Sequence, residues 1–178
     1  MGGGMGGVSE DLLTTKGDTH GFSTLNSRVP IGADLAVLTA DSTAALGLAW
    51  TAPASSTEMV SIAMGDETTV LAAASTTVPV VTFSMPYGFT LTGVIVSAVT
   101  APTGAALVTV DVHEDGLTIL STKVTIDAGE KTSATAATPP VISDSGLAVN
   151  SLIQVFVDQI DTDNVATGLK IYLLGTQT

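Results

Sequence analysis

Apolar and polar residues alternate with a period of two through most of the chain after residue 58. The clearest alternating runs are residues 59–64, 68–73, 80–85, 89–95, 108–113, 117–126, 153–158 and 169–173. Because successive side chains of a β-strand point to opposite faces, each run predicts a strand with one buried face. Turn-forming residues separate the runs at about 8 to 12 residues, a spacing typical of antiparallel sandwiches. The pattern therefore predicts an all-β antiparallel β-sandwich, jelly-roll-like, over residues 59–178.

The strongest local signal is the pair Asp115-Gly116 between two of these runs. Glycine readily adopts the positive φ that a tight hairpin turn requires. We therefore expect residues 108–113 and the run that follows Gly116 to form an antiparallel hairpin. Threonine and valine dominate the region, and both favour strands because their branched side chains restrict χ1.

Residues 1–58 sustain neither a strand period nor a helical period. Short apolar clusters follow a glycine-rich tract, at residues 12–13, 29–31, 35–38 and 46–50, and residues 51–58 read as a linker. Apolar surface this small and scattered cannot close a core of its own. We expect residues 1–58 to form an extended N-terminal arm that docks on a partner, ahead of the sandwich domain. The expected partner-docking residues are Met1, Met5, Val8, Leu12, Leu13 and Trp50.

Composition indicates that this chain is buried against other molecules. Hydrophobic residues make up 45% of the 178 residues and charged residues 12%, with a mean hydropathy of +0.50. A free monomer ordinarily carries more surface charge, so we expect a subunit of a symmetric assembly. The formal net charge of -12 repels phosphate backbones and anionic lipids, which argues against nucleic-acid and membrane partners. Without cysteine there can be no disulfide, and without a basic, apolar start we expect no secretory leader.

Catalytic motifs are missing from the sequence. It has no Gly-x-Ser-x-Gly elbow, no phosphate-binding Gly-x-x-x-x-Gly-Lys loop and no His-Glu-x-x-His pair. His20 lies in the glycine-rich N-terminal region, and His113 is interpreted as a solvated strand end beside Glu114 and Asp115. We therefore predict a non-enzymatic protein without cofactors. Aromatic residues, at 4%, are too few to favour a sugar-binding face of stacked rings.

The densest acidic segment contains Asp158, Asp161, Asp163 and Asn164. Closely spaced oxygen ligands on a loop suit calcium, but their spacing differs from that of an EF-hand loop. A polar turn, in which Asp and Asn side chains cap their own backbone, is the favoured interpretation. Calcium binding by the three aspartates stays open at this point.

Four short blocks in the N-terminal region resemble a module common near the N-termini of bacteriophage fibre and virion-surface proteins. The blocks are Leu13-Thr14-Thr15-Lys16-Gly17-Asp18, Arg28-Val29-Pro30-Ile31-Gly32, Val37-Leu38-Thr39-Ala40-Asp41-Ser42 and Gly47-Leu48-Ala49-Trp50. The chain departs from the usual pattern at residues 19–20, at Ala49 and at residues 34–36, where Asn-Gly-Gln is typical.

The second half resembles a β-sandwich domain that recurs in phage structural proteins. The matching segments are residues 85–92, 100–104, 119–123, 127–133 and 168–170. Together the two resemblances cover most of residues 12–174. They imply a virion component without catalytic residues, and they suggest homotrimers.

Two roles within a virion compete. A capsid decoration (cement) protein would bind the major capsid protein through its arm and stabilise the shell by the surface it buries. A tail or head fibre would attach to an adaptor and present a receptor-binding face for a host glycan. Because no heptad repeat is present to form a shaft, decoration of the outer capsid surface, after synthesis in the host cytoplasm, is the favoured hypothesis. A carbohydrate-binding module attached to a bacterial enzyme is a third, less favoured class.

Overall fold

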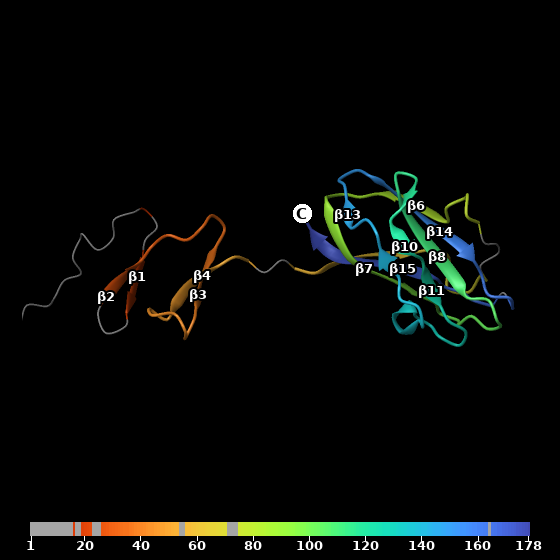
Figure 1. Cartoon of the computed structure of the whole chain (residues 1–178), viewed down its shortest axis with the longest axis horizontal. Coiled ribbons are helices and arrows are strands. Elements are labelled where there is room, and N and C mark those ends of the chain that lie inside the picture. The colour runs from red at the N-terminus through yellow and green to blue at the C-terminus, as the bar shows by residue number, and fades with distance from the viewer. Residues whose placement is uncertain (1–15, 17–18, 23–25, 54–55, 71–74, 164) are drawn as a thin grey trace, which may run out of the picture. The chain divides into compact units, whose positions relative to one another are not determined.

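The chain forms two compact units, Met1–Ala54 and Ser55–Thr178, called here the N-terminal unit and the C-terminal unit. The computed structural model in Figure 1 describes residues 16, 19–22, 26–53, 56–70, 75–163 and 165–178. The boundary between the units lies inside the segment expected to be a linker, and the first strand of the C-terminal unit begins at Glu58.

Two antiparallel hairpins occupy the described part of the N-terminal unit, where the sequence predicts an extended arm. Their strands are β1 (Thr19–Phe22) with β2 (Asn26–Val29), and β3 (Val37–Ala40) with β4 (Leu48–Thr51). The β3–β4 loop is closed by Asp41, whose backbone N–H donates to the Gly47 carbonyl at 2.9 Å. The Asp41 carboxylate also accepts from the Thr43 hydroxyl at 2.6 Å. Strands of four residues are too short for a period of two to stand out in the sequence.

Two antiparallel sheets make up most of the C-terminal unit (Figure 1). Sheet 1 has the order β13-β7-β15-β5, with strands β5 (Glu58–Ala63), β7 (Phe89–Ser97), β13 (Gly146–Leu147) and β15 (Lys170–Gln177). Sheet 2 has the order β11-β8-β14-β6, with strands β6 (Val81–Ser84), β8 (Val108–Glu114), β11 (Val124–Ile126) and β14 (Leu152–Gln159), and β9 (Leu117–Thr118) pairs with β8. The remaining elements are the pair β10 (Leu120–Thr122) and β12 (Val141–Ile142) and the 3-10 turn η2 (Ser133–Thr135). The described residues contain no α-helix.

One apolar core lies between the two sheets. Val110 and Val112 of β8 in sheet 2, and Ile171 and Leu173 of β15 in sheet 1, are each at most 1% exposed and belong to the same buried cluster. Their neighbours along each strand point outward, as a pleated strand requires. The predicted all-β antiparallel sandwich is therefore confirmed.

Connections in the first half of the C-terminal unit alternate between the sheets. The chain passes from β5 in sheet 1 to β6 in sheet 2, then back to β7 and across again to β8. As a result, strands that pair are distant in sequence, and Leu173 of β15 faces Val60 of β5 on one side and Val94 of β7 on the other.

The predicted hairpin between β8 and β9 is confirmed. His113 faces Thr118 and Glu114 faces Leu117, which leaves Asp115 and Gly116 as the two turn residues. Both have positive φ, 49° and 87°, the conformation of a type I′ turn.

Two predicted strands differ from the structure. In the run 68–73, Thr68 and Thr69 instead donate their backbone N–H groups to the Asp66 carboxylate, Val70 forms an isolated bridge to Thr167, and residues 71–73 lie outside the described residues. The short polar side chain of Asp66 thus turns the backbone away from a strand. The run 117–126 is broken into β9, β10 and β11, which pair with different partners.

Candidate functional site

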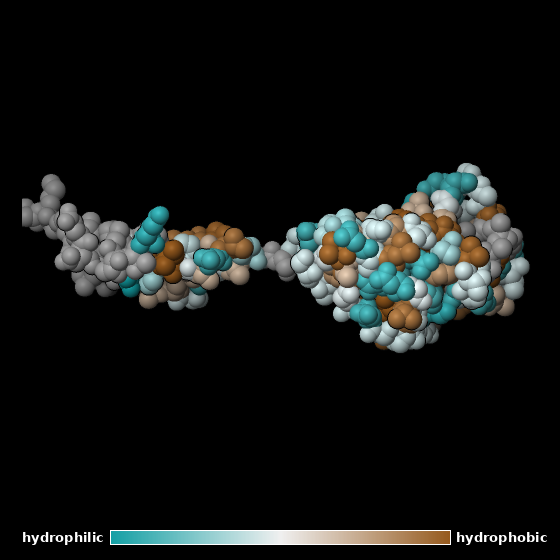
Figure 2. Space-filling model, turned by 90° about the horizontal axis from the view of Figure 1, so that it is seen from above, coloured by the Kyte–Doolittle hydropathy of each residue, from teal (hydrophilic) through white to brown (hydrophobic). Residues whose placement is uncertain are grey.

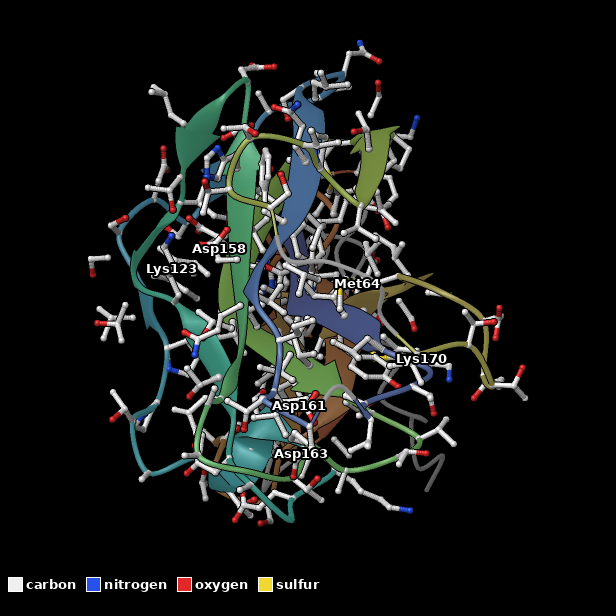
Figure 3. All side chains as sticks on the ribbon, turned by 90° about the vertical axis from the view of Figure 1, so that its right-hand side faces the viewer. Met64, Lys123, Asp158, Asp161, Asp163 and Lys170 are labelled. Carbon is white, nitrogen blue, oxygen red and sulfur yellow. The ribbon has the colours of Figure 1, made fainter. Side chains whose placement is uncertain are left out.

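The outer face of sheet 2 carries a cluster of charged side chains. Asp111 and His113 lie on β8 at alternate positions, so both point away from the core that Val110 and Val112 fill. Lys123 precedes β11, and Asp158 lies on β14. Figure 3 shows Lys123 beside Asp158.

Asp111 is the centre of this cluster, although its side chain points away from the core and is only 4% exposed. Its Oδ1 accepts hydrogen bonds from the Thr118 hydroxyl at 2.6 Å and from the Val112 backbone N–H at 2.9 Å. Its Oδ2 lies 3.1 Å from Lys123 Nζ and 3.2 Å from His113 Nε2. Burial alone would raise the pKa of the Asp111 carboxyl, but hydrogen bonds from Thr118, Lys123 and His113 outweigh it and lower that pKa.

Lys123 joins the two carboxylates of the cluster. Its ammonium group forms an ion pair with Asp158 and another with Asp111. The hydrogen bond to Asp158 is the main reason that the pKa of Lys123 is raised, so the side chain stays protonated. A protonated lysine held between two carboxylates fixes neighbouring strands and cannot serve as a general base.

The interpretation of His113 as a solvated strand end is wrong. Its Nε2 is 3.2 Å from Asp111 Oδ2, and its ring centroid lies 4.5 Å from that of Phe156. The side chain is 21% exposed. The alternation along β8 placed Asp111 and His113 on one face, which was a signal for this contact. Lys123, just before β11, and Asp158, on β14, reach the cluster through strand pairing that the sequence could not give.

We expect Asp111→Asn to lower the free energy of unfolding at pH 7 by about 2 kcal/mol, because charge-assisted hydrogen bonds are replaced by weaker ones. Since the folded state lowers the pKa of this carboxyl from its ordinary value of 3.8, its contribution is complete above that value and is lost as the pH falls below it. The difference between wild type and variant should therefore shrink at pH 3. Urea unfolding at pH 7 and pH 3 measures this difference in the free energy of unfolding, with Asp144→Asn at an exposed position as control. A difference that does not change with pH would contradict a lowered pKa of Asp111 in the folded state.

The three acidic side chains considered for calcium serve different partners. Asp161 is 2% exposed, and its Oδ2 accepts from the backbone N–H groups of Thr103 at 3.3 Å and Val165 at 3.1 Å. Asp163 accepts from the Thr103 hydroxyl at 2.9 Å. Figure 3 shows Asp158 away from these two residues, which lie together.

The acidic loop combines one local backbone contact, from Val165 to Asp161, with contacts to a second loop at Thr103. Both Asp161 and Asp163 fasten the segment after β14 to the loop at Thr103, and the second oxygen of Asp161 is buried without a hydrogen-bond partner among the described residues. Within the described ranges, no group of three or more His, Cys, Asp or Glu side chains is arranged to hold a metal ion. Asn164 lies outside the described residues.

Among the predicted docking residues, Trp50 is described, whereas Met1, Met5, Val8, Leu12 and Leu13 lie outside the described residues. Trp50 is half-buried on β4, and its indole N–H donates to the Pro30 carbonyl at 2.6 Å. Its ring covers Gly32 so closely that a Cβ atom there would lie 2.5 Å from ring atoms. Trp50 therefore holds the segment before β3 against the β3–β4 hairpin.

Large apolar side chains are exposed beside this anchor. Ile31 is 52% exposed, Leu35 87% and Val37 54%. Hydrophobic surface is visible on both units in Figure 2. The sequence placed these residues in apolar clusters but gave no sign that they would face solvent.

Comparisons with known proteins give no relative from which a role could be transferred. No protein-family model, no curated protein and no solved structure matches the chain. In the part of the chain that the structure describes, no helix has the length and apolar character needed to cross a membrane.

Proposed function

We propose that the chain is a non-enzymatic structural protein of a bacteriophage virion, a decoration (cement) protein that binds the outer capsid surface through its N-terminal unit and stabilises the shell. The observation that carries the proposal is the exposed apolar set Ile31, Leu35 and Val37, which lies at the first residue of β3 and in the segment before it that Trp50 holds in place. Exposed apolar side chains that gather on one small unit are typical of interaction surfaces. The two phage-protein resemblances support the same class of protein.

Leu35 is the most informative of these residues. It lies in a turn closed by the Ala36 N–H and the Ala33 carbonyl at 3.0 Å, and its φ is 67°. A branched, non-glycine residue in this left-handed conformation costs on the order of 1 kcal/mol. The side chain is 87% exposed, so its packing within the described N-terminal unit does little to offset this cost. A partner that buries Leu35 would supply the missing stabilisation.

The C-terminal unit suits the role of a compact outer domain. The strand orders of its two sheets, β5-β15-β7-β13 and β6-β14-β8-β11, support a jelly roll, which we propose as its finer fold class. The jelly roll is common in viral capsid domains, but it also occurs in lectins. The major capsid protein is the proposed partner, and the resemblance favours a homotrimer on the virion surface.

We expect Leu35→Asp to reduce occupancy on particles by at least about 30-fold, because a charge placed in an apolar contact must be desolvated. Quantitative mass spectrometry of purified particles, complemented with wild type or variant, measures the copy number. Leu117→Asp, which changes a 77% exposed leucine of the C-terminal unit, is the matched control.

Three outcomes separate the hypotheses. Hundreds of wild-type copies per particle with loss only for Leu35→Asp support decoration. A few copies at the tail, together with glycan-array binding by the purified protein, would support the receptor-binding alternative. Full occupancy of the Leu35→Asp variant would overturn docking through the N-terminal unit.

A further inference from the structure

The outer face of sheet 1 is almost free of charge. Three rows of outward side chains cross its three longest strands, and cross-strand register places three residues in each row. The rows are Met59, Leu174 and Gly93; Ser61, Tyr172 and Ile95; and Ala63, Lys170 and Ser97. We call these nine residues the neutral face.

Its one charged group and two of its hydroxyls are already paired. Lys170 is the only charged residue of the nine, and its Nζ donates to Glu67 Oε1 at 2.5 Å. The Tyr172 and Ser97 hydroxyls lie 3.1 Å apart and share a hydrogen bond. The centre of the face therefore offers apolar surface from Met59, Ile95 and Leu174 without an unpaired charge to desolvate.

This face contrasts with the rest of the molecule. The chain carries 17 acidic and 5 basic residues, and the outer face of sheet 2 presents the charged cluster around Asp111. A core depleted of charge, with Tyr and Met present and charges at the border, is the anatomy of protein interfaces. Glu58, at the start of β5, and the Lys170–Glu67 pair mark that border here.

The edge of the same sheet is open as well. Among the described strands β5 pairs only with β15, and its other edge has no strand partner. Proline, bulges and charged side chains protect an edge strand against pairing with another chain, and residues 58–63 contain only one of these features, the charge of Glu58 at the start of the strand. Met59 on this edge strand is 57% exposed.

We propose that the neutral face binds a second copy of this chain, so that the protein is a homo-oligomer. Two copies with a net charge of -12 repel each other, and the repulsion is least where the contacting surfaces are uncharged. A partner of opposite charge would instead select an acidic surface of this molecule. The inference uses the C-terminal unit alone and does not depend on the proposed virion role.

The test is the molar mass of the full chain in solution. Light scattering after size-exclusion chromatography, at about 50 µM, should give a multiple of the 17.8 kDa chain for the wild type. Leu174→Lys and Met59→Lys should each weaken association by at least about 30-fold, because a buried ammonium group would lack a partner. Both changes reduce the net negative charge, so dissociation could not result from increased repulsion.

Leu117→Lys makes the same chemical change at the 77% exposed tip of the β8–β9 hairpin and should leave the oligomer intact. Far-UV circular dichroism checks that each variant is folded, and the outward, exposed Met59 is the site least able to disturb folding. A monomeric wild type, or an oligomer that survives both neutral-face substitutions, would overturn the inference. A monomer that still occupies particles would overturn this inference and the proposed homotrimer, while leaving decoration of the capsid surface in place.

Discussion

Replacing Phe89 with alanine is expected to lower the free energy of unfolding of the C-terminal unit by about 3 to 5 kcal/mol, the cost of a large cavity in a packed core. Phe89 is 1% exposed and begins β7, where it faces Leu147 of β13 and Gln177 of β15. Its ring lies against Gly175, where a Cβ atom would be 2.5 Å from the ring. The side chain thus fills space where three strands of sheet 1 meet.

Urea unfolding followed by far-UV circular dichroism measures this loss. Leu117→Ala removes a leucine that is 77% exposed, and it should change the free energy of unfolding by less than about 0.5 kcal/mol. A loss below about 1 kcal/mol for Phe89→Ala would show that the core closes around the missing ring, contrary to the packing described.

Replacing Trp50 with alanine is expected to destabilise the β3–β4 hairpin by about 2 kcal/mol, less than for a fully buried ring because Trp50 is half-buried. The change removes the hydrogen bond to Pro30 and the cover over Gly32. For a unit with so little apolar surface, this loss is a large share of its stability.

Hydrogen exchange of the amides in β3 and β4 reads this effect directly, and rates should rise by about 30-fold. Trp50→Phe is the informative control, since it keeps a ring on Gly32 and removes only the indole N–H. The Trp50→Phe variant should give a smaller increase in the exchange rates of β3 and β4. Unchanged exchange in Trp50→Ala would remove the anchoring role.

Much of the sandwich could be predicted from the period-two pattern because its long strands each have one buried face. The runs at 89–95, 108–113 and 153–158 correspond to β7, β8 and β14. The pattern does not encode which strands pair, because pairing joins residues that are far apart in sequence. That is why Lys123 and Asp158 could not be placed beside Asp111 in advance.

Short-range chemistry explains the other differences. Asp66 captures the backbone of Thr68 and Thr69, which overrides the strand preference of the threonines. Leu35 has a φ of 67°, a conformation that glycine adopts readily and leucine rarely. A leucine there predicts neither the turn nor the exposure.

The position of β15 has a consequence for how the protein is made. Although β15 follows the other strands in the sequence, it lies between β5 and β7 in sheet 1. On the ribosome, β5 and β7 therefore keep their facing hydrogen-bonding edges open until β15 has been made. Strands with unpaired edges are prone to aggregate. Pairing strands that are far apart in the sequence also makes folding slow, because a long loop must be closed. Sheet 1 of a nascent chain can therefore close only after β15 has emerged from the exit tunnel.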